Sequence, residues 1–298
     1  MYTSSSPLFF KNKIFEQMKK LVVLSFLLVF ISNISAQKSE IGIGFGLSTY
    51  YGDLSGDILL NNLKQSHPAV QVIYNYYFNR YFNSRISLGH GTVSGDDSFS
   101  TKDWQKERNL SFQSSITELS GIAEFNILGI NHRINPFLYS GVNIFHYNPK
   151  TFYKGEWIYL QPLGTEGQGS YLHPDRPKYS LMDISLIFGG GIKFKINPSL
   201  MLSLELGWRR TNSDYLDDIS KDYVGYSELK RTNGELAATL ADRTNEYNGF
   251  SPESRIAGSQ RGGDKIKDYY SMSFINIVYT LNSGNPIKRR NKVICPGF

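Results

Sequence analysis

Apolar and polar residues alternate with a period of two in eight segments of the chain. The clearest example is the segment 200–210, which has leucine or tryptophan on one face and Ser203, Glu205, Gly207 and Arg209 on the other. This period indicates β-strands with one apolar and one polar face. The other segments are 40–52, 69–78, 84–93, 110–128, 136–147, 183–196 and 268–281. In segment 136–147 both faces are apolar, so its register stays open.

The connections between these segments alternate in length. Those after the second, fourth and sixth segments are short, whereas the other links span about 52–67, 94–109, 148–178 and 211–267. An even number of antiparallel strands with short turns at one rim and long loops at the other is typical of bacterial outer-membrane barrels. The 20 Tyr and 19 Phe suit the aromatic girdles of such barrels. The sequence therefore predicts an all-β fold, an eight-stranded antiparallel transmembrane β-barrel with short periplasmic turns and long extracellular loops over residues 37–282.

The polar face of the predicted strands carries both acids and bases. The lumen of an eight-stranded barrel is just wide enough to be filled by side chains, and buried charges there must pair. We therefore expect a plugged interior rather than a passive pore, with Glu205 compensating Arg209 or a neighbouring lysine. The predicted interior ion-pair network consists of Arg85, Glu118, Glu124, Lys193, Lys195, Glu205 and Arg209.

The two ends of the chain differ from its middle. Lys19 and Lys20 precede an apolar run that ends near Ala36, which is typical of a secretory signal peptide. We interpret residues 1–36 as that signal peptide, with 1–17 a possible extension ahead of a start at Met18. Residues 283–298 are predicted to form a basic periplasmic tail, so that both mature termini are periplasmic. The only cysteine, Cys295, lies in this tail and cannot form an internal disulfide.

The formal net charge of +6 is concentrated at these two ends, and the remainder is close to neutral. A generally basic nucleic-acid-binding surface is therefore not predicted. The tail bases have two interpretations: they oppose translocation, or they contact an acidic periplasmic partner. These bases are Lys288, Arg289, Arg290 and Lys292.

No motif for catalysis, metal binding or cofactor binding is recognisable. The acidic run at Asp214, Asp217 and Asp218 could bind calcium or supply carboxylates, but it lacks calcium-loop spacing. No nucleophile motif such as Gly-x-Ser-x-Gly occurs. Histidines near the predicted outer rim are dispersed, without metal-ligand spacing: His67, His90, His146 and His173. We expect no catalytic residues, no metal and no cofactor.

The fourth long loop contains apolar residues that allow a short helix, namely Leu229, Leu236, Ala237, Leu240 and Ala241. Connections of this length are usually functional or mobile. Two interpretations stay open: a surface loop that shields the barrel rim, or a docking surface.

Three motifs carry a resemblance to a known family: "YYGDLSGD" at 50–57, "YLQPLGTEGQG" at 159–169 and "LELGWRRTNSDYLDDIS" at 204–220. Together they resemble the small outer-membrane β-barrel family typical of Bacteroidetes, which includes the PorG-like component of the type IX secretion system. The resemblance covers roughly residues 38–282. Trp208, Arg209, Asp214, Asp217 and Asp218 match the motif positions.

The resemblance implies a non-enzymatic barrel that contacts outer-membrane lipid and anchors a periplasmic ring, made of a lipoprotein and its partner protein, for protein secretion and gliding motility. The contact is expected at the short turns near Arg80, His132 and Asn197, and at the basic tail. The alternative is an envelope enzyme or surface-binding barrel that acts through the long extracellular loops.

Overall fold

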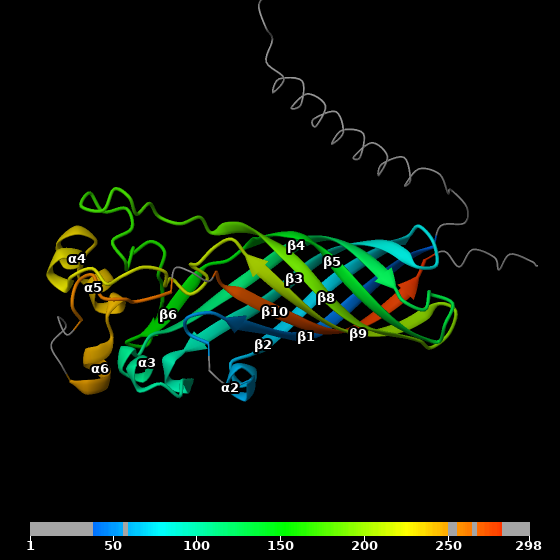
Figure 1. Ribbon diagram of the computed structural model, residues 1–298, viewed down its shortest axis with the longest axis horizontal. Coiled ribbons are helices and arrows are strands. Elements are labelled where there is room, and N and C mark those ends of the chain that lie inside the picture. The colour runs from blue at the N-terminus through cyan, green and yellow to red at the C-terminus, as the bar shows by residue number, and fades with distance from the viewer. Residues whose placement is uncertain (1–37, 56–58, 250–254, 264–266, 282–298) are drawn as a thin grey trace, which may run out of the picture.

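Eight strands close into a barrel in the computed structural model, which describes residues 38–55, 59–249, 255–263 and 267–281. The sheet runs in the order β3-β2-β1-β10-β9-β8-β5-β4, and a further pairing of β3 with β4 closes it (Figure 1). Every neighbouring pair is antiparallel. This confirms the predicted fold class. The predicted signal peptide and basic tail lie outside the described residues.

Each barrel strand coincides with one of the alternating segments. A period of two places successive side chains on opposite faces of a strand, so one set faces lipid and the other faces the lumen. The strands are β1 (Ser39–Tyr51), β2 (His67–Tyr77), β3 (Phe82–Asp96), β4 (Ser111–Asn126), β5 (Ile134–His146), β8 (Met182–Lys195), β9 (Leu200–Thr211) and β10 (Tyr269–Thr280). In β5, whose register the sequence left open, Phe137 and Tyr139 face inward while Leu138 and Val142 face outward.

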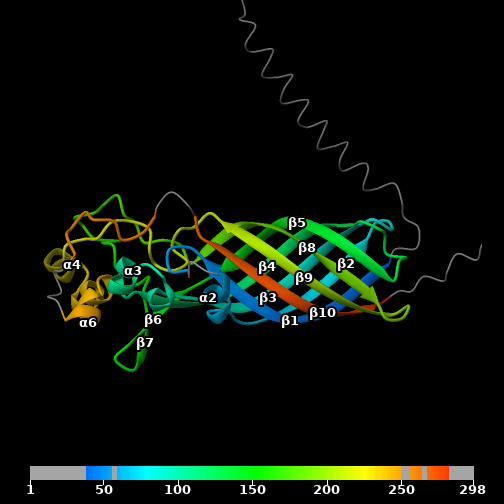
Figure 2. The same cartoon turned by 60° about the horizontal axis from the view of Figure 1, so that its bottom comes forward.

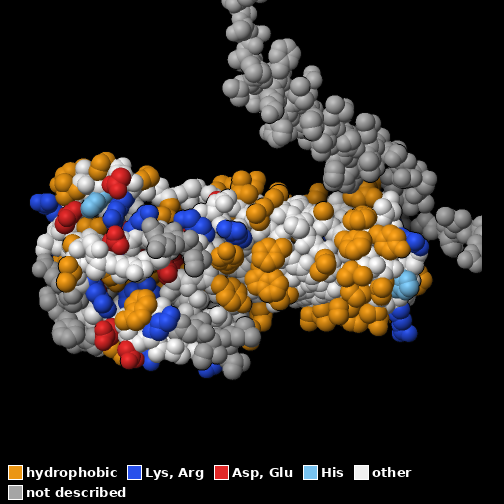
Figure 3. Space-filling model, viewed as in Figure 1, with side chains coloured by type: hydrophobic (Ala, Val, Ile, Leu, Met, Phe, Trp, Pro, Cys, Tyr) orange, Lys and Arg blue, Asp and Glu red, His pale blue; other side chains and the backbone are white. Residues whose placement is uncertain are grey.

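The outer wall of the barrel is apolar. Alternate side chains of every strand, such as Phe45, Ile86, Leu119 and Leu186, are about half exposed in the isolated chain. Figure 3 shows hydrophobic side chains over the barrel wall, with charged side chains mainly over the two ends of the molecule. A continuous apolar surface of this size requires a lipid solvent. Among the residues described, no helix is long and apolar enough to cross a membrane.

The lumen is narrow and filled. A Cβ atom added to Gly44 would lie 2.1 Å from Oδ1 of Asn276, and one added to Gly207 would lie 2.2 Å from the hydroxyl of Tyr139. Inward apolar side chains from β4, β5 and β8 form a small cluster of Ile122, Phe137, Tyr139 and Ile187. These glycines therefore make room for large side chains from other strands, as a small barrel requires.

The long connections fold into a cap beyond one rim of the barrel (Figures 1 and 2). The cap contains the hairpin of β6 (Pro149–Tyr153) and β7 (Glu156–Tyr159), which pairs with β4. Its helices are α2 (Leu59–Lys64), η1 (Asp97–Phe99), α3 (Asp103–Arg108), α4 (Tyr226–Thr232), α5 (Glu235–Ala241) and α6 (Thr244–Asn248). An apolar core joins the cap to the part of the lumen nearest to it. Its residues include Leu54, Leu110, Leu160 and Leu216.

The fourth loop corrects one sequence expectation. In place of a single short helix it contains α4 and α5, separated at Asn233 and Gly234. Gly234 has a φ of 101°, which an L-residue with a side chain rarely adopts. Of the apolar residues expected to share one helix, Leu229, Ala237 and Ala241 pack into one cluster. Leu240 packs into the larger cap core, and Leu236 is exposed.

Candidate functional site

The lumen holds a connected set of buried ion pairs. Arg85 of β3 contacts Glu124 of β4 at 2.5 Å and Glu205 of β9 at 2.7 Å. Lys193 of β8 also pairs with Glu124 and donates a hydrogen bond to Asn126 at 2.9 Å. All of these charged groups are almost fully buried. The network therefore ties together strands on different sides of the barrel.

A second ion pair lies closer to the cap. Arg209 donates to both carboxylate oxygens of Glu118, at 2.8 and 3.2 Å. Glu118 also accepts hydrogen bonds from Asn143 and from the hydroxyl of Tyr270, each at 2.7 Å. This carboxylate is thus satisfied by charge and by neutral donors, as a buried charge requires.

The partner of Glu205 differs from the expectation. Glu205 pairs with Arg85, not with Arg209 or a lysine. Positions 205 and 209 lie four residues apart on one strand, roughly 13 Å at about 3.3 Å per residue. Glu205 therefore reaches Arg85 across the lumen, while Arg209 reaches Glu118.

Two charged residues, Glu40 and Lys195, differ from the predicted ion-pair network of the lumen. Glu40 was not among the predicted interior charges, yet it is fully buried, pairs with Lys38 and accepts a hydrogen bond from Tyr77 at 2.8 Å. Glu40 lies on the same face of β1 as Gly42 and Gly44, and this alternation could have identified it as an inward-facing residue. Lys195 is half-buried at the short-turn end and makes no ion pair within the part of the chain that the structure describes.

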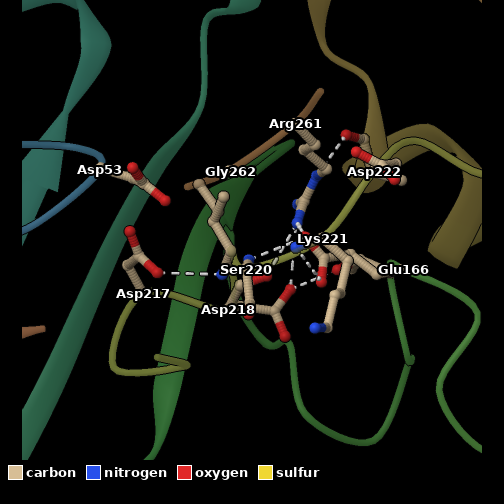
Figure 4. Close-up of polar contacts among 12 residues, drawn as sticks. Asp53, Glu166, Asp217, Asp218, Ser220, Lys221, Asp222, Arg261 and Gly262 are labelled. Atoms are coloured by element: carbon tan, nitrogen blue, oxygen red, sulfur yellow. Dashed lines mark hydrogen bonds and ion pairs between the residues drawn. The ribbon is translucent and has the colours of Figure 1, made fainter. Parts of the chain in front are cut away.

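In the cap, two buried arginines join all four long loops. Arg108 pairs with Asp97 at 2.7 Å and donates to the backbone carbonyls of Asp53 and Arg261, at 2.9 and 2.7 Å. Arg261 pairs with Glu166 at 2.9 Å and donates to the carbonyl of Asp218 at 2.8 Å. Figure 4 shows Glu166 and Asp218 beside the Arg261 side chain. The loops therefore form one folded unit.

The acidic run of the fourth loop is buried. Asp214, Asp217 and Asp218 are each at most 4% exposed. Burial raises the pKa of Asp218 to about 6 against the opposing effect of Arg261 and the hydrogen bonds from Thr165 and Tyr179. Burial, then the nearby carboxylates of Asp268 and Asp53, raises the pKa of Asp217 well above its ordinary value.

A carboxyl pair in the cap shares one tyrosine. The hydroxyl of Tyr50 lies 2.7 Å from Oδ2 of Asp217 and 2.8 Å from Oδ1 of Asp268. A phenol carries one proton, so it can donate to only one of these oxygens. The second short contact fits a protonated carboxyl that donates to the phenol. The pKa of Asp268 is likewise raised by burial, which agrees with this arrangement.

The histidines do not converge. His67 contacts Ser94 at 2.8 Å, His90 contacts Thr117 at 2.9 Å, and His173 contacts Glu228 at 2.9 Å. His146 is exposed at the outer end of β5. Across the described ranges, no group of three or more His, Cys, Asp or Glu side chains could hold a metal ion.

The predicted partner-binding residues of the short turns all lie at the rim opposite the cap. His132 and Asn197 line one small recess there, together with Lys38 and Lys195, whereas Arg80 lies in a separate turn over the ring of Tyr81. Residues 38 and 281, where the barrel begins and ends, lie at the same rim (Figure 1). The predicted contacts Lys288, Arg289, Arg290 and Lys292 lie outside the described residues.

Comparison with known families gives a clear match over most of the chain. Residues 19–239 match a family model described as a domain of unknown function, DUF6089. The chain belongs to this family. The matched range includes all three motifs noted in the sequence and ends within α5. No curated protein matches the chain in sequence.

Solved structures with some similarity are small outer-membrane proteins. Ail, the attachment invasion locus protein of Yersinia pestis, is 10% identical with a TM-score of 0.40, over 83% of this chain and 99% of that chain. OprG from Pseudomonas aeruginosa is 11% identical with a TM-score of 0.40, over 84% and 99%. Neisserial surface protein A is 6% identical with a TM-score of 0.38, over 82% and 97%. The strand pairing of this chain, rather than these low scores, defines its fold.

Proposed function

We propose that this protein is a non-enzymatic outer-membrane barrel that anchors a periplasmic ring complex of the type IX protein secretion system at its short-turn rim. The observation that carries the proposal is the filled, ion-paired lumen. Arg85, Glu124, Lys193 and Glu205 occupy the cross-section that a solute would need. Because the lumen is filled, the two ends of the barrel remain as the surfaces for partner binding.

The charge of the short-turn rim supports an acidic partner. Lys38, Arg80, Arg133 and Lys195 lie there, half-buried or exposed. Within the described residues 38–40, 78–82, 127–134 and 195–200, the only acid is Glu40, which is fully buried. The predicted basic tail would extend the same positive surface. The proposed partners are a ring lipoprotein and its partner protein, the components that the sequence resemblance implies.

Apart from positions 204–211 in β9, the residues that carry this resemblance lie at the opposite end from the proposed contact. Asp53, Glu166 and Asp218 belong to the three motifs, and all three lie in the cap network. We infer that the motifs maintain the cap fold, and that the ring contact depends on the short turns, which they do not include.

A pull-down from detergent-solubilised envelopes, followed by mass spectrometry, tests the anchor. Charge reversal by Arg80→Glu with Arg133→Glu is expected to reduce recovery of the ring lipoprotein at least about tenfold, because like charges would face the acidic partner. Deletion of residues 283–298 tests the tail separately. The matched control is Lys154→Glu in the exposed cap hairpin, which should leave recovery unchanged. If the unmodified barrel elutes without a periplasmic protein, the anchor proposal fails.

A second candidate, surface binding through the cap, is favoured by the folded state of the loops. An enzyme is less well supported, because Tyr50, Asp217 and Asp268, the closest approach to an acid–base group, are each at most 3% exposed. A substrate could not reach them without opening the cap.

A further inference from the structure

A groove of about 320 Å³ lies on the outer side of the cap. One wall is formed by the end of α2 and the start of β2, and the other by the β6–β7 hairpin, with the extended ends of β3 and β4 as the floor. Figure 2 shows the hairpin projecting from the cap beyond the barrel. This volume lies at the lower end of the range typical of small-molecule sites.

The hairpin wall is aromatic and open to solvent. Phe152 is 51% and Trp157 48% exposed, and their rings meet edge to face with centroids 5.4 Å apart. The ammonium of Lys150 lies 4.7 Å from the Trp157 ring centroid. Because the two rings pack against each other on the hairpin, they stay exposed and offer apolar surface to a ligand.

The opposite wall contains an unpaired polar group. Gln65 is 7% exposed and lines the groove, and among the described residues neither atom of its side-chain amide has a hydrogen-bond partner. Both amide atoms are enclosed, so a ligand pairs with them only when the side chain turns into the groove. Leaving a buried donor and acceptor unpaired costs free energy unless a ligand or water pairs them. His67 and Ser94 lie beside it, joined by a 2.8 Å contact.

The charged residues of the lining include one base, Lys64, and one acid, Asp96. An occupant must therefore offer an apolar face to the rings, a donor and an acceptor to one amide, and no strong net charge. The pyranose ring of a sugar has these three properties together, since its C–H face is apolar and each hydroxyl both donates and accepts.

We propose that the groove between α2 and the β6–β7 hairpin binds a neutral saccharide, with Trp157 and Phe152 packing against a sugar ring and the Gln65 side chain turning into the groove so that its amide pairs with the sugar hydroxyls. The site lies at the opposite end of the barrel from the proposed ring contact, so it does not rest on the anchor function. The saccharide could be free or the sugar portion of a glycolipid in the surrounding membrane.

Fluorescence of Trp157 tests the proposal directly. The chain has three tryptophans, so the full-length protein with Trp104→Phe and Trp208→Phe reports from the groove alone. Purified in detergent micelles, it is titrated with maltotriose, cellotriose, chitotriose and the delipidated core oligosaccharide of host lipopolysaccharide. We expect a saturable emission change with at least one of them. Comparison with intact lipopolysaccharide distinguishes a free from a lipid-linked source.

Two variants make the test specific. Gln65→Leu is expected to weaken binding about tenfold or more while its heat-unfolding temperature does not fall, since an unpaired amide is removed. Phe152→Ala, at an exposed position, should weaken binding similarly. Tyr171→Ala, an exposed cap aromatic outside the groove, is the control and should bind normally. No response to any sugar, or unchanged affinity in both groove variants, overturns the proposal.

Discussion

The lumen and the cap both bury charge, yet they differ in how they neutralise it. Each buried glutamate in the described lumen faces an arginine or lysine. In the described cap, seven buried acids, Asp97, Glu166, Asp214, Asp217, Asp218, Asp242 and Asp268, accompany two buried arginines, Arg108 and Arg261. The cap therefore relies on backbone donors, neutral hydroxyls and raised pKa values, and its stability should depend on pH more than that of the barrel.

The largest expected effect is the loss of a central lumen acid. Glu124→Gln removes the carboxylate shared by Arg85 and Lys193 and leaves Lys193 as an uncompensated buried cation. Breaking such a pair costs about 3–5 kcal/mol. The heat-unfolding temperature, read from the mobility shift between folded and unfolded barrel on gels, should fall clearly. Glu156→Gln on the exposed hairpin is the control, and equal unfolding temperatures would contradict paired-charge stabilisation of the barrel.

A substitution in the cap tests whether the cap and the barrel unfold independently. Arg261→Met removes the donor to Glu166 and to the carbonyl of Asp218, so about 3–5 kcal/mol of local stability should be lost. Limited proteolysis should then cut the cap rapidly while the barrel keeps its heat-unfolding temperature. Arg231→Met, at an exposed position of α4, should leave the cap resistant. If the barrel unfolds together with the cap, the two regions are one cooperative unit.

Glu205→Gln should have a smaller effect than Glu124→Gln. Arg85 keeps Glu124 as its partner after this change, and the new amide can still accept a hydrogen bond from Gln71. The loss of one charge-assisted bond costs about 1.5–3 kcal/mol. The same gel assay measures it, and a fall as large as that of Glu124→Gln would mean that Arg85 depends on Glu205 alone.

The pH dependence is the smallest expected effect. A carboxyl whose folded-state pKa is raised holds its proton more tightly when folded, so its stabilising contribution is present at low pH and declines as pH rises. For Asp218, with a pKa of about 6, this decline falls between about pH 4 and 6, and for Asp217 and Asp268 it extends higher. The contribution of Asp218 to cap stability should drop by about 1 kcal/mol between pH 5 and 7.

Trp104 in α3 can report this change after Trp157→Phe and Trp208→Phe, with urea midpoints measured across the pH range. Asp218→Asn should reduce the pH dependence of cap stability between pH 4 and 6, because this side chain no longer titrates, and leave the part due to Asp217 and Asp268. A cap midpoint that rises from pH 5 to 7 would show that its carboxyls are held charged, as in the lumen.

The barrel could be predicted from the sequence because lipid on one side and a filled lumen on the other impose a strict alternation on every strand. Strand segments such as 183–196, and inward residues such as Arg85 and Lys193, follow from that period alone. The pairing inside could not be predicted, since Glu205 and Arg85 meet across the lumen and no local spacing encodes the distance between β3 and β9.

The cap was less predictable for the same reason. Alternation ends at the rim, and contacts such as Arg108 with the carbonyl of Arg261, and Arg261 with the carbonyl of Asp218, join residues more than 40 positions apart. The motif at 50–57 and the acidic run at 214–218 could be recognised in the sequence, but their burial together could not be predicted from it. The groove had no sequence signal at all, because Gln65 and Trp157 come from different loops.

The two arginines that join the loops also limit how the exposed face of this protein can diversify. Loops that fold independently can each vary in sequence without affecting the others. Here the side chains of Asp53, Glu166 and Asp218 contact Gly263, Arg261 and Thr165 in other loops, so a change at any of the three disturbs a second loop. We expect variation among related chains to concentrate in the β6–β7 hairpin and on the outer faces of α4 and α5, while the joined segments change only together.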